Sequence, residues 1–210
     1  MSADQFTSAI KVEPGNPELQ DCASIVDLGS ALLAIVADGA GGRSNAREAA
    51  EAVVRTISQK ADALALSDPA ECRHLLSRAD DEALKTGGES TGVFVLLTKS
   101  SITGASVGDS QAWIIDRGDI TVMTDAQKRK PCLGTGATSP VAFWFPPLTG
   151  TLLVASDGLF NYASREAIAQ VVRKSDLRLA VRNLVELVRY PSGELPDDVS
   201  VILVRAPGSE

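Results

Sequence analysis

Residues 31–42 read ALLAIVADGAGG, a run of apolar residues that ends at Asp38 and is followed by a glycine-rich break. Such a run is typical of a short strand that is buried on both of its faces. From residue 44 onward, apolar side chains recur at the spacing i, i+3, i+4, i+7, which is the pattern of an amphipathic helix. This stretch therefore predicts a buried strand, a sharp break after Asp38 and a helix that begins directly after the glycines.

The rest of the chain alternates between helical and β-prone segments. A second amphipathic pattern surrounds residues 72–79, and residues 92–123 consist of short β-prone runs separated by turn residues, which predicts an antiparallel meander. Residues 151–156 form another apolar strand, which ends at Asp157. Two helical patterns and a last apolar strand at residues 199–205 follow it.

Paired helices and hairpin-like strands together favour an α+β fold over a parallel, doubly wound sheet. We expect a four-layer α-β-β-α sandwich, in which two stacked antiparallel sheets are flanked by helix pairs. We also expect residues 1–210 to form a single domain. Residues 124–149 are rich in Pro, Gly and Thr, so the sequence predicts a long irregular loop there.

Composition and charge exclude several classes of function. The net charge of −7 and the absence of a basic block argue against nucleic acid as a partner. Three cysteines without CxxC spacing predict reduced thiols rather than a disulfide framework or a thiolate zinc site. The first 15 residues lack a signal-peptide pattern, and no apolar run reaches membrane-spanning length. We therefore expect a cytoplasmic monomer that does not bind membranes.

Three aspartates share one kind of position. Asp38 and Asp157 each end a buried apolar strand and precede Gly, whereas Asp197 introduces the last strand. Strand ends of one core can converge, and clustered carboxylates there need hard cations such as Mg²⁺ or Mn²⁺ to neutralise them. The alternative interpretation is that each Asp-Gly pair only forms a turn.

A set of six short motifs occurs in one order along nearly the whole chain. They are Asp21, VADGAGG at 36–42, STG at 90–92, VGDSQAWII at 107–115, SDGL at 156–159 and DDVSVILV at 197–204. In these motifs the chain resembles the metal-dependent protein serine/threonine phosphatases of type 2C. It resembles a small bacterial-type member, because residues 124–149 are too short for the full flap subdomain that the family commonly inserts there.

The resemblance implies a set of metal ligands. Asp38 would bridge two Mn²⁺ or Mg²⁺ ions, Gly39 would offer its carbonyl to one of them, and Asp157 with Asp197 would bind the other. Asp21 would hold metal-bound water or a metal directly. Asp109 would bind a third, weaker ion, although a hairpin-turn role for this residue fits the sequence equally well.

The resemblance also implies the reaction. A water activated by two metal ions would hydrolyse phosphoserine or phosphothreonine in a signalling protein, with Asp38, Asp157 and Asp197 as the catalytic residues. No protein nucleophile is required. This agrees with a sequence that has a single histidine and no Ser-His-Asp or Cys-His arrangement to offer.

The sequence departs from the family at several positions. Asn16 stands where the family places a phosphate-binding Arg, for which Lys11 is a candidate substitute, and Ala40 stands where many members have His. Asp198 replaces a usual Asn. His74 lies off the apolar stripe of its helix, so we expect it to be exposed to solvent. With no full flap the site should be open, and Phe143 to Phe145 either form a substrate-contacting ridge or pack onto the core.

Two other functions remain open from the sequence. The losses at positions 16 and 40 favour a pseudophosphatase that acts as a regulatory binding module. The DGAGG break before a helix could instead bind a nucleotide or phosphate through backbone N–H groups, but it lacks a Lys and the spacing of known phosphate loops.

Overall fold

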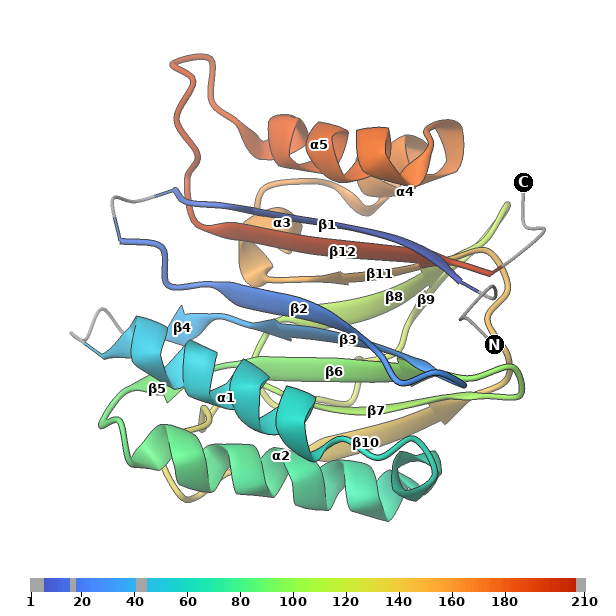
Figure 1. The fold of residues 1–210 in the computed structure, drawn as a ribbon. Helices are drawn as coiled ribbons and strands as arrows, with labels where there is room; N and C mark the ends of the chain where they lie inside the picture. Colours follow the sequence, from blue (N-terminus) through green and yellow to red (C-terminus); the bar gives the residue numbers. More distant parts are fainter. Residues whose placement is uncertain (1–5, 16–17, 41–44, 207–210) are drawn as a thin grey trace.

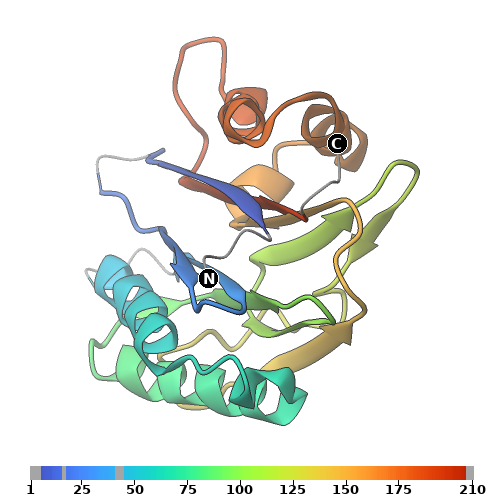
Figure 2. The same cartoon turned by 45° about the vertical axis from the view of Figure 1, so that its right-hand side comes forward.

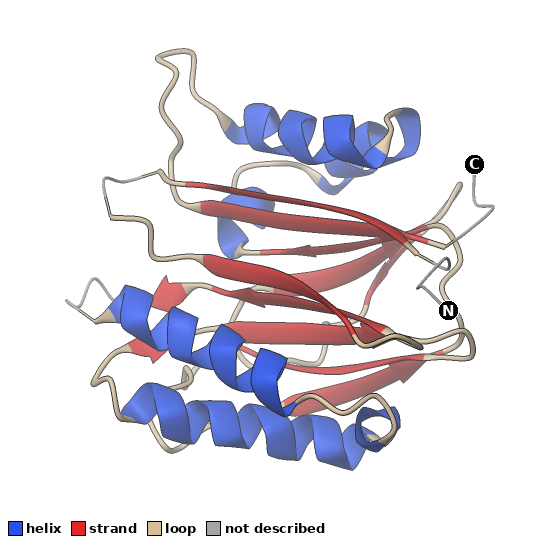
Figure 3. Cartoon of the chain, viewed as in Figure 1, coloured by secondary structure: helices blue, strands red, loops and turns tan. Residues whose placement is uncertain are grey.

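The computed structural model describes residues 6–15, 18–40 and 45–206, and it confirms the α+β fold. Its helices are α1 (Ala46–Lys60), the short 3₁₀ helix η1 (Ala65–Ser67), α2 (Pro69–Leu84), α3 (Asp157–Phe160), α4 (Arg165–Lys174) and α5 (Leu177–Val188). Figures 1 and 3 show two stacked sheets, with α1 and α2 on the outer side of one and α4 and α5 on the outer side of the other. The turned view in Figure 2 shows the same four layers.

The first sheet carries the α4–α5 layer. It is antiparallel, and its strand order is β1 (Thr7–Glu13), β12 (Val199–Arg205), β11 (Thr151–Ala155), β8 (Gln111–Ile115) and β9 (Ile120–Val122). The two apolar runs predicted as buried strands, β11 and β12, lie side by side at its centre. Neighbouring strands cover both of their edges, which suits their mostly apolar and buried side chains.

The second sheet carries the α1–α2 layer and is also antiparallel. Its strand order is β10 (Val141–Phe145), β7 (Ile102–Val107), β6 (Gly92–Leu97), β3 (Leu32–Ala37) and β2 (Cys22–Asp27). A two-stranded ribbon of β4 (Gly39–Ala40) and β5 (Glu89–Ser90) continues beyond β3. All six residues of β3 are buried, as the apolar run predicts.

The four layers enclose three separate apolar cores. One lies between the sheets, where Val36, Val95 and Val154 are fully buried. The second lies under α1 and α2, and the third under α4 and α5. The buried face of α1 is built largely from alanine, so this helix can lie close to the sheet. None of the helices in the described part of the chain is long and apolar enough to cross a bilayer.

The structure differs from the sequence-based expectation in the segment 124–149, which contains the strand β10. In β10, Phe143 is buried, whereas the neighbouring Trp144 is 56% exposed. Phe143 lies opposite Gly104 of β7, where a β-carbon would come within 2.6 Å of its ring. The strand therefore depends on an aromatic ring that covers a glycine on the adjacent strand, and no local pattern reveals that pairing. Phe143 packs onto the core, and Trp144 points outward.

Candidate metal centre

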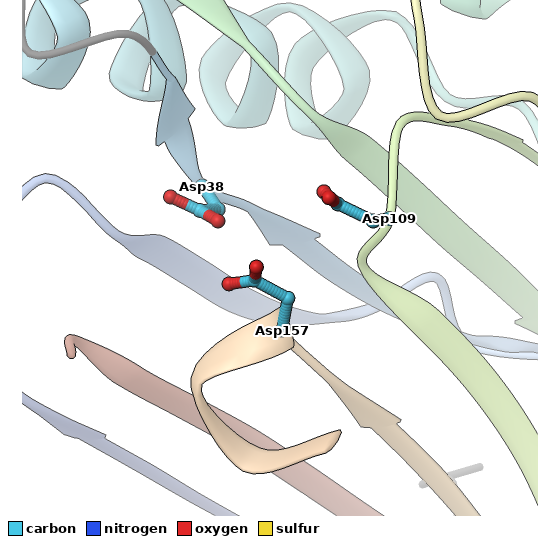
Figure 4. Close-up of side chains that lie close together, drawn as sticks. All are labelled: Asp38, Asp109 and Asp157. Carbon is cyan, nitrogen blue, oxygen red and sulfur yellow. The ribbon is translucent and has the colours of Figure 1, made fainter. Parts of the chain in front are cut away.

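Three carboxylates from three separate segments converge at one end of the two sheets. Asp38 follows β3, Asp109 lies in the turn between β7 and β8, and Asp157 opens α3 directly after β11. One carboxylate oxygen of each lies within 4.8 Å of those of the other two. Figure 4 shows the three side chains pointing toward one another. The expected convergence of strand-end aspartates thus occurs for Asp38 and Asp157, and Asp109 joins them.

Asp21 lies directly behind Asp38. Cys22 of β2 pairs with Ala37 of β3, so Asp21 and Asp38 both follow the last pair at the same end of this ladder. Asp21 is only 5% exposed, and no donor among the described residues lies within hydrogen-bond distance of its carboxylate oxygens. Burial raises its pKa, and the nearby hydroxyls of Ser156 and Ser200 offset only part of this effect. A buried carboxylate without a donor is costly, because its charge has lost its water. Its position therefore fits a site that receives a cation.

The electrostatics of the cluster show the same need for positive charge. Burial, followed by the charges of Asp21, Asp157 and Asp197, raises the pKa of the Asp38 carboxyl to about 10. Burial above all raises the pKa of Asp21 to about 7. The pKa values of Asp157 and Asp197 are also raised, mainly by burial and then by neighbouring carboxylates. In the absence of cations, protons must therefore neutralise part of this cluster.

Asp38, Asp109 and Asp157 line a polar cavity of about 400 Å³, whereas Asp21 does not line it. Gly39, Ala40 and Asp197 also line it, so the strand-introducing aspartate lies at the same site as the strand-ending ones. The donor set is made of oxygen atoms, which Mg²⁺ and Mn²⁺ prefer. The residues present thus fit the two cations that the sequence motifs imply.

The backbone on both sides of Asp38 is held in place by the STG motif. Asp38 N–H donates to Thr91 Oγ1 at 3.0 Å, while Thr91 N–H and Ser90 Oγ donate to the Asp38 carbonyl at 2.8 and 3.0 Å. Thr91 Oγ1 also shares a 2.7 Å hydrogen bond with Ser110 Oγ, beside Asp109. These contacts position Asp38 without using its carboxylate, which remains available to a ligand.

Two glycines of the motifs lie so close to neighbouring backbone atoms that a side chain would not fit there. A β-carbon on Gly39 would lie 2.6 Å from the Ala46 carbonyl oxygen at the start of α1. A β-carbon on Gly158 would lie 2.0 Å from the Asp198 carbonyl oxygen. Glycine after each aspartate therefore lets the helix α1 and the strand β12 reach the site.

Asp198 has a role that sequence reasoning did not find. Its carboxylate accepts the backbone N–H groups of Gly15 at 2.7 Å and Gln20 at 2.6 Å. It thereby ties the connection between β1 and β2 to the start of β12, next to Asp197. Because this carboxylate accepts hydrogen bonds from two backbone amides, we interpret Asp198 as a residue that positions the backbone rather than as a metal ligand. Only the three-dimensional arrangement reveals this role.

Other predicted residues lie away from the cavity or outside the described part. Lys11 pairs with Glu13 on β1 at 2.8 Å and does not line the cavity. Asn16 lies outside the described residues. His74 is exposed on α2, as expected, with 71% of its side chain accessible.

Arg129 and Lys130, which no sequence pattern singled out, line the cavity. Arg129 Nε donates to Asp109 Oδ2 at 2.5 Å. Both residues lie in the segment that the sequence predicted as an irregular loop, where no periodicity indicates which side chains face the site. Residue type alone therefore gave no signal that could have found them.

A protein-family model matches the sequence, and solved structures match the fold. The family model of protein phosphatase 2C matches residues 14–131. No curated protein matches the sequence itself.

Solved structures that resemble the fold include bacterial phosphatases. PppA, "a key regulatory component of T6SS in Pseudomonas aeruginosa", has a TM-score of 0.79 and 20% identity over 96% of this chain and 97% of its own. The catalytic domain of PstP in complex with two manganese ions has a TM-score of 0.78 and 19% identity, over 96% and 98%. Serine/threonine phosphatase Stp1 from Staphylococcus aureus has a TM-score of 0.81 and 18% identity, over 97% and 96%.

Proposed function

Because the chain belongs to the protein phosphatase 2C family, we propose that it is a metal-dependent phosphatase that hydrolyses phosphoserine and phosphothreonine in a signalling protein. The observation that carries this proposal is the convergence of Asp38, Asp109 and Asp157 within 4.8 Å in a polar cavity. Carboxylates this close must be neutralised, and divalent cations do so in a way that also attracts a phosphate.

We assign the site to two Mn²⁺ or Mg²⁺ ions. The bound manganese in the PstP catalytic domain supports this choice of metal. Asp38, with Asp157 and Asp197, is assigned to bind the ions and to serve catalysis, and Gly39 is assigned to contribute its carbonyl. Asp21 is assigned to hold metal-bound water or a metal directly, and its buried oxygens, which no donor in the described part of the chain reaches at hydrogen-bond distance, support this assignment. Asp109 is assigned to a third, weaker ion.

When bound, the cations would supply neutralisation of phosphate charge and activation of water. The protein would supply the geometry. Thr91 and Ser90 fix the backbone of Asp38, and Asn161 Nδ2 donates to Asp157 Oδ2 at 2.8 Å, which orients that carboxylate. Hydrolysis would break the bond between phosphorus and the serine or threonine oxygen and form one to the oxygen of water, and a proton of that water would end on the serine or threonine oxygen.

An open polar cavity suits a protein substrate better than it suits a small metabolite, which would have to be enclosed. We propose that residues 1–210 act as one domain, as a cytoplasmic monomer.

The competing function is a pseudophosphatase that binds a partner without turnover. Ala40, which lines the cavity where the related enzymes often have a histidine, is the observation that favours it.

The test is turnover of a phosphothreonine peptide by the purified protein with Mn²⁺, with Mg²⁺ and with EDTA. We expect hydrolysis with either metal, none in EDTA, and recovery when metal is restored. Asp157→Asn should abolish turnover. Asp81→Asn, which changes an exposed aspartate on α2, should leave it unchanged.

Two results would contradict the proposal in different ways. Turnover that persists in EDTA would exclude a metal-dependent reaction. Metal binding without turnover of any phosphopeptide or of p-nitrophenyl phosphate would favour the pseudophosphatase.

A further inference from the structure

Two basic residues of one segment, Arg129 and Lys130, line the acidic cavity. Among the described residues that line this cavity, Arg129 and Lys130 are the only ones with a positive charge, whereas four aspartates besides Asp198 supply negative charge. A phosphate monoester that enters the cavity carries negative charge itself. It therefore needs cationic partners in addition to any metal, and this segment supplies them.

The segment is anchored just before and just after the two basic residues. Gly108 N–H donates to the Lys128 carbonyl at 3.2 Å, and Gln127 Nε2 donates to the Ser110 carbonyl at 3.0 Å. On the other side, Leu133 and Ser90 exchange two backbone hydrogen bonds of 2.8 and 2.9 Å. Both anchors lie beside the site, because Ser90 also holds the Asp38 carbonyl.

A buried aspartate on α2 fixes the continuation of the same segment. The Asp80 carboxylate accepts Gly134 N–H at 2.6 Å, Gly136 N–H at 3.3 Å and Thr138 Oγ1 at 2.7 Å. Asp80 is 6% exposed, so these charge-assisted hydrogen bonds are shielded from water. Residues 127–138 are thus held against the site as a fixed wall.

The guanidinium of Arg129 has unused donors. Its Nε is bound to Asp109, but within the described part of the chain no hydrogen bond engages its two terminal nitrogens. Its side chain is 71% exposed at the cavity wall. The planar fork of arginine matches two oxygens of a phosphate, and the contact to Asp109 orients that fork in advance.

We propose that Arg129 is the phosphate-binding residue of this site, holding the substrate phosphoryl group through its terminal nitrogens while Nε remains on Asp109. Lys130 adds a second positive charge beside it. This inference rests on the proposed phosphatase function. It gives the phosphate a protein ligand from the segment between β9 and β10, far along the sequence from position 16, where the family places its arginine.

The experiment compares Arg129→Ala and Arg129→Lys with Arg178→Ala, an exposed arginine on α5 that lines no cavity described above. The first measurement is KM and kcat for a phosphothreonine peptide at saturating Mn²⁺. The second is the affinity for inorganic phosphate, measured by calorimetry on the Mg²⁺-loaded protein. Arg129→Ala should raise KM and the phosphate Kd by roughly tenfold or more, with kcat changed by less than about threefold. Arg129→Lys should recover part of the loss, and Arg178→Ala should match the wild type.

Several outcomes would overturn the inference. Unchanged KM and phosphate affinity in Arg129→Ala would exclude a contact with phosphate. A change confined to the Mn²⁺ concentration needed for activity would show that Arg129 serves only Asp109. If the wild type has no turnover, the proposed function fails and the phosphate titration alone decides the role of Arg129. Circular dichroism checks the fold, and Arg129→Gln replaces the alanine variant if that variant is unfolded.

Discussion

Replacing Asp38 by Asn removes the charge at the centre of the carboxylate cluster and nearly preserves its shape. The pKa of this carboxyl is raised from 3.8 to about 10 by burial and by Asp21, Asp157 and Asp197. Below pH 3.8 the folded and unfolded chains both hold the proton, so the carboxyl has no effect on stability. Above that pH the unfolded chain releases the proton and the folded chain keeps it, so stability falls as pH rises toward 10.

The size of the effect follows from the pH interval. Each pH unit between 3.8 and the folded pKa lowers the free energy of unfolding by about 1.4 kcal/mol, so at pH 7 the cost reaches about 4 kcal/mol. Asn has no proton to release. Metal-free Asp38→Asn should therefore be more stable than the wild type by up to about 4 kcal/mol at pH 7, and the gain should shrink toward pH 4.

Urea unfolding in EDTA and in Mn²⁺, between pH 4 and pH 8, measures the stability of the variant and of the wild type without and with metal. In EDTA the variant should unfold at higher urea than the wild type. In Mn²⁺ the order should reverse, because ligand binding stabilises only a protein that can hold the ion. Asp81→Asn should follow the wild type throughout. If Asp38→Asn gained no stability in EDTA at pH 7 and responded to Mn²⁺ like the wild type, Asp38 would be excluded as a metal ligand and would only form a turn.

Three further predictions concern the contacts that frame the site. Asp80→Ala should lower the free energy of unfolding by about 2–4 kcal/mol in a denaturation assay, because the N–H groups of Gly134 and Gly136 lose a buried acceptor. It should also weaken phosphate binding, measured by calorimetry, although Arg129 is intact. Asp198→Ala should cost about 2–4 kcal/mol, since two amides lose their acceptor, and Asp198→Asn should recover part of this in the same denaturation assay. Gly134→Ala should destabilise the protein far more than Gly193→Ala: both glycines have φ of +91°, but only at Gly134 would the β-carbon strike a backbone oxygen, at 2.2 Å. Equal thermal shifts in the two alanine variants would show that backbone strain, rather than the clash, sets the cost.

The buried strands and their terminal aspartates could be predicted from the sequence because each depends on local information. An apolar run such as 31–37 has few alternatives to a doubly buried strand, and the aspartate that ends it must then lie at a sheet edge. The four layers followed from the order of helices and strands. The meeting of Asp38 and Asp157 was therefore accessible without coordinates.

Other features could not be predicted, because they depend on pairing between distant segments. The strand β10 forms where Phe143 covers Gly104, and Asp198 captures the amides of Gly15 and Gln20. Arg129 faces the cavity because its neighbours are bound to Ser110 and Ser90. Residue type and local spacing do not predict such contacts between distant segments.

The carboxylates of the site are divided between the two sheets. Asp38 follows a strand of one sheet, whereas Asp157 and Asp197 flank strands of the other. A cation held by both groups would act as a clamp across the interface between the sheets, where most other contacts are between apolar side chains. Its binding would slow the separation of the layers, so amide hydrogen exchange in β3 and β11 would report occupancy of the site while exchange in the outer helices would not. If the proposed cations bind, the strength of their binding would also measure how firmly the two sheets are held together.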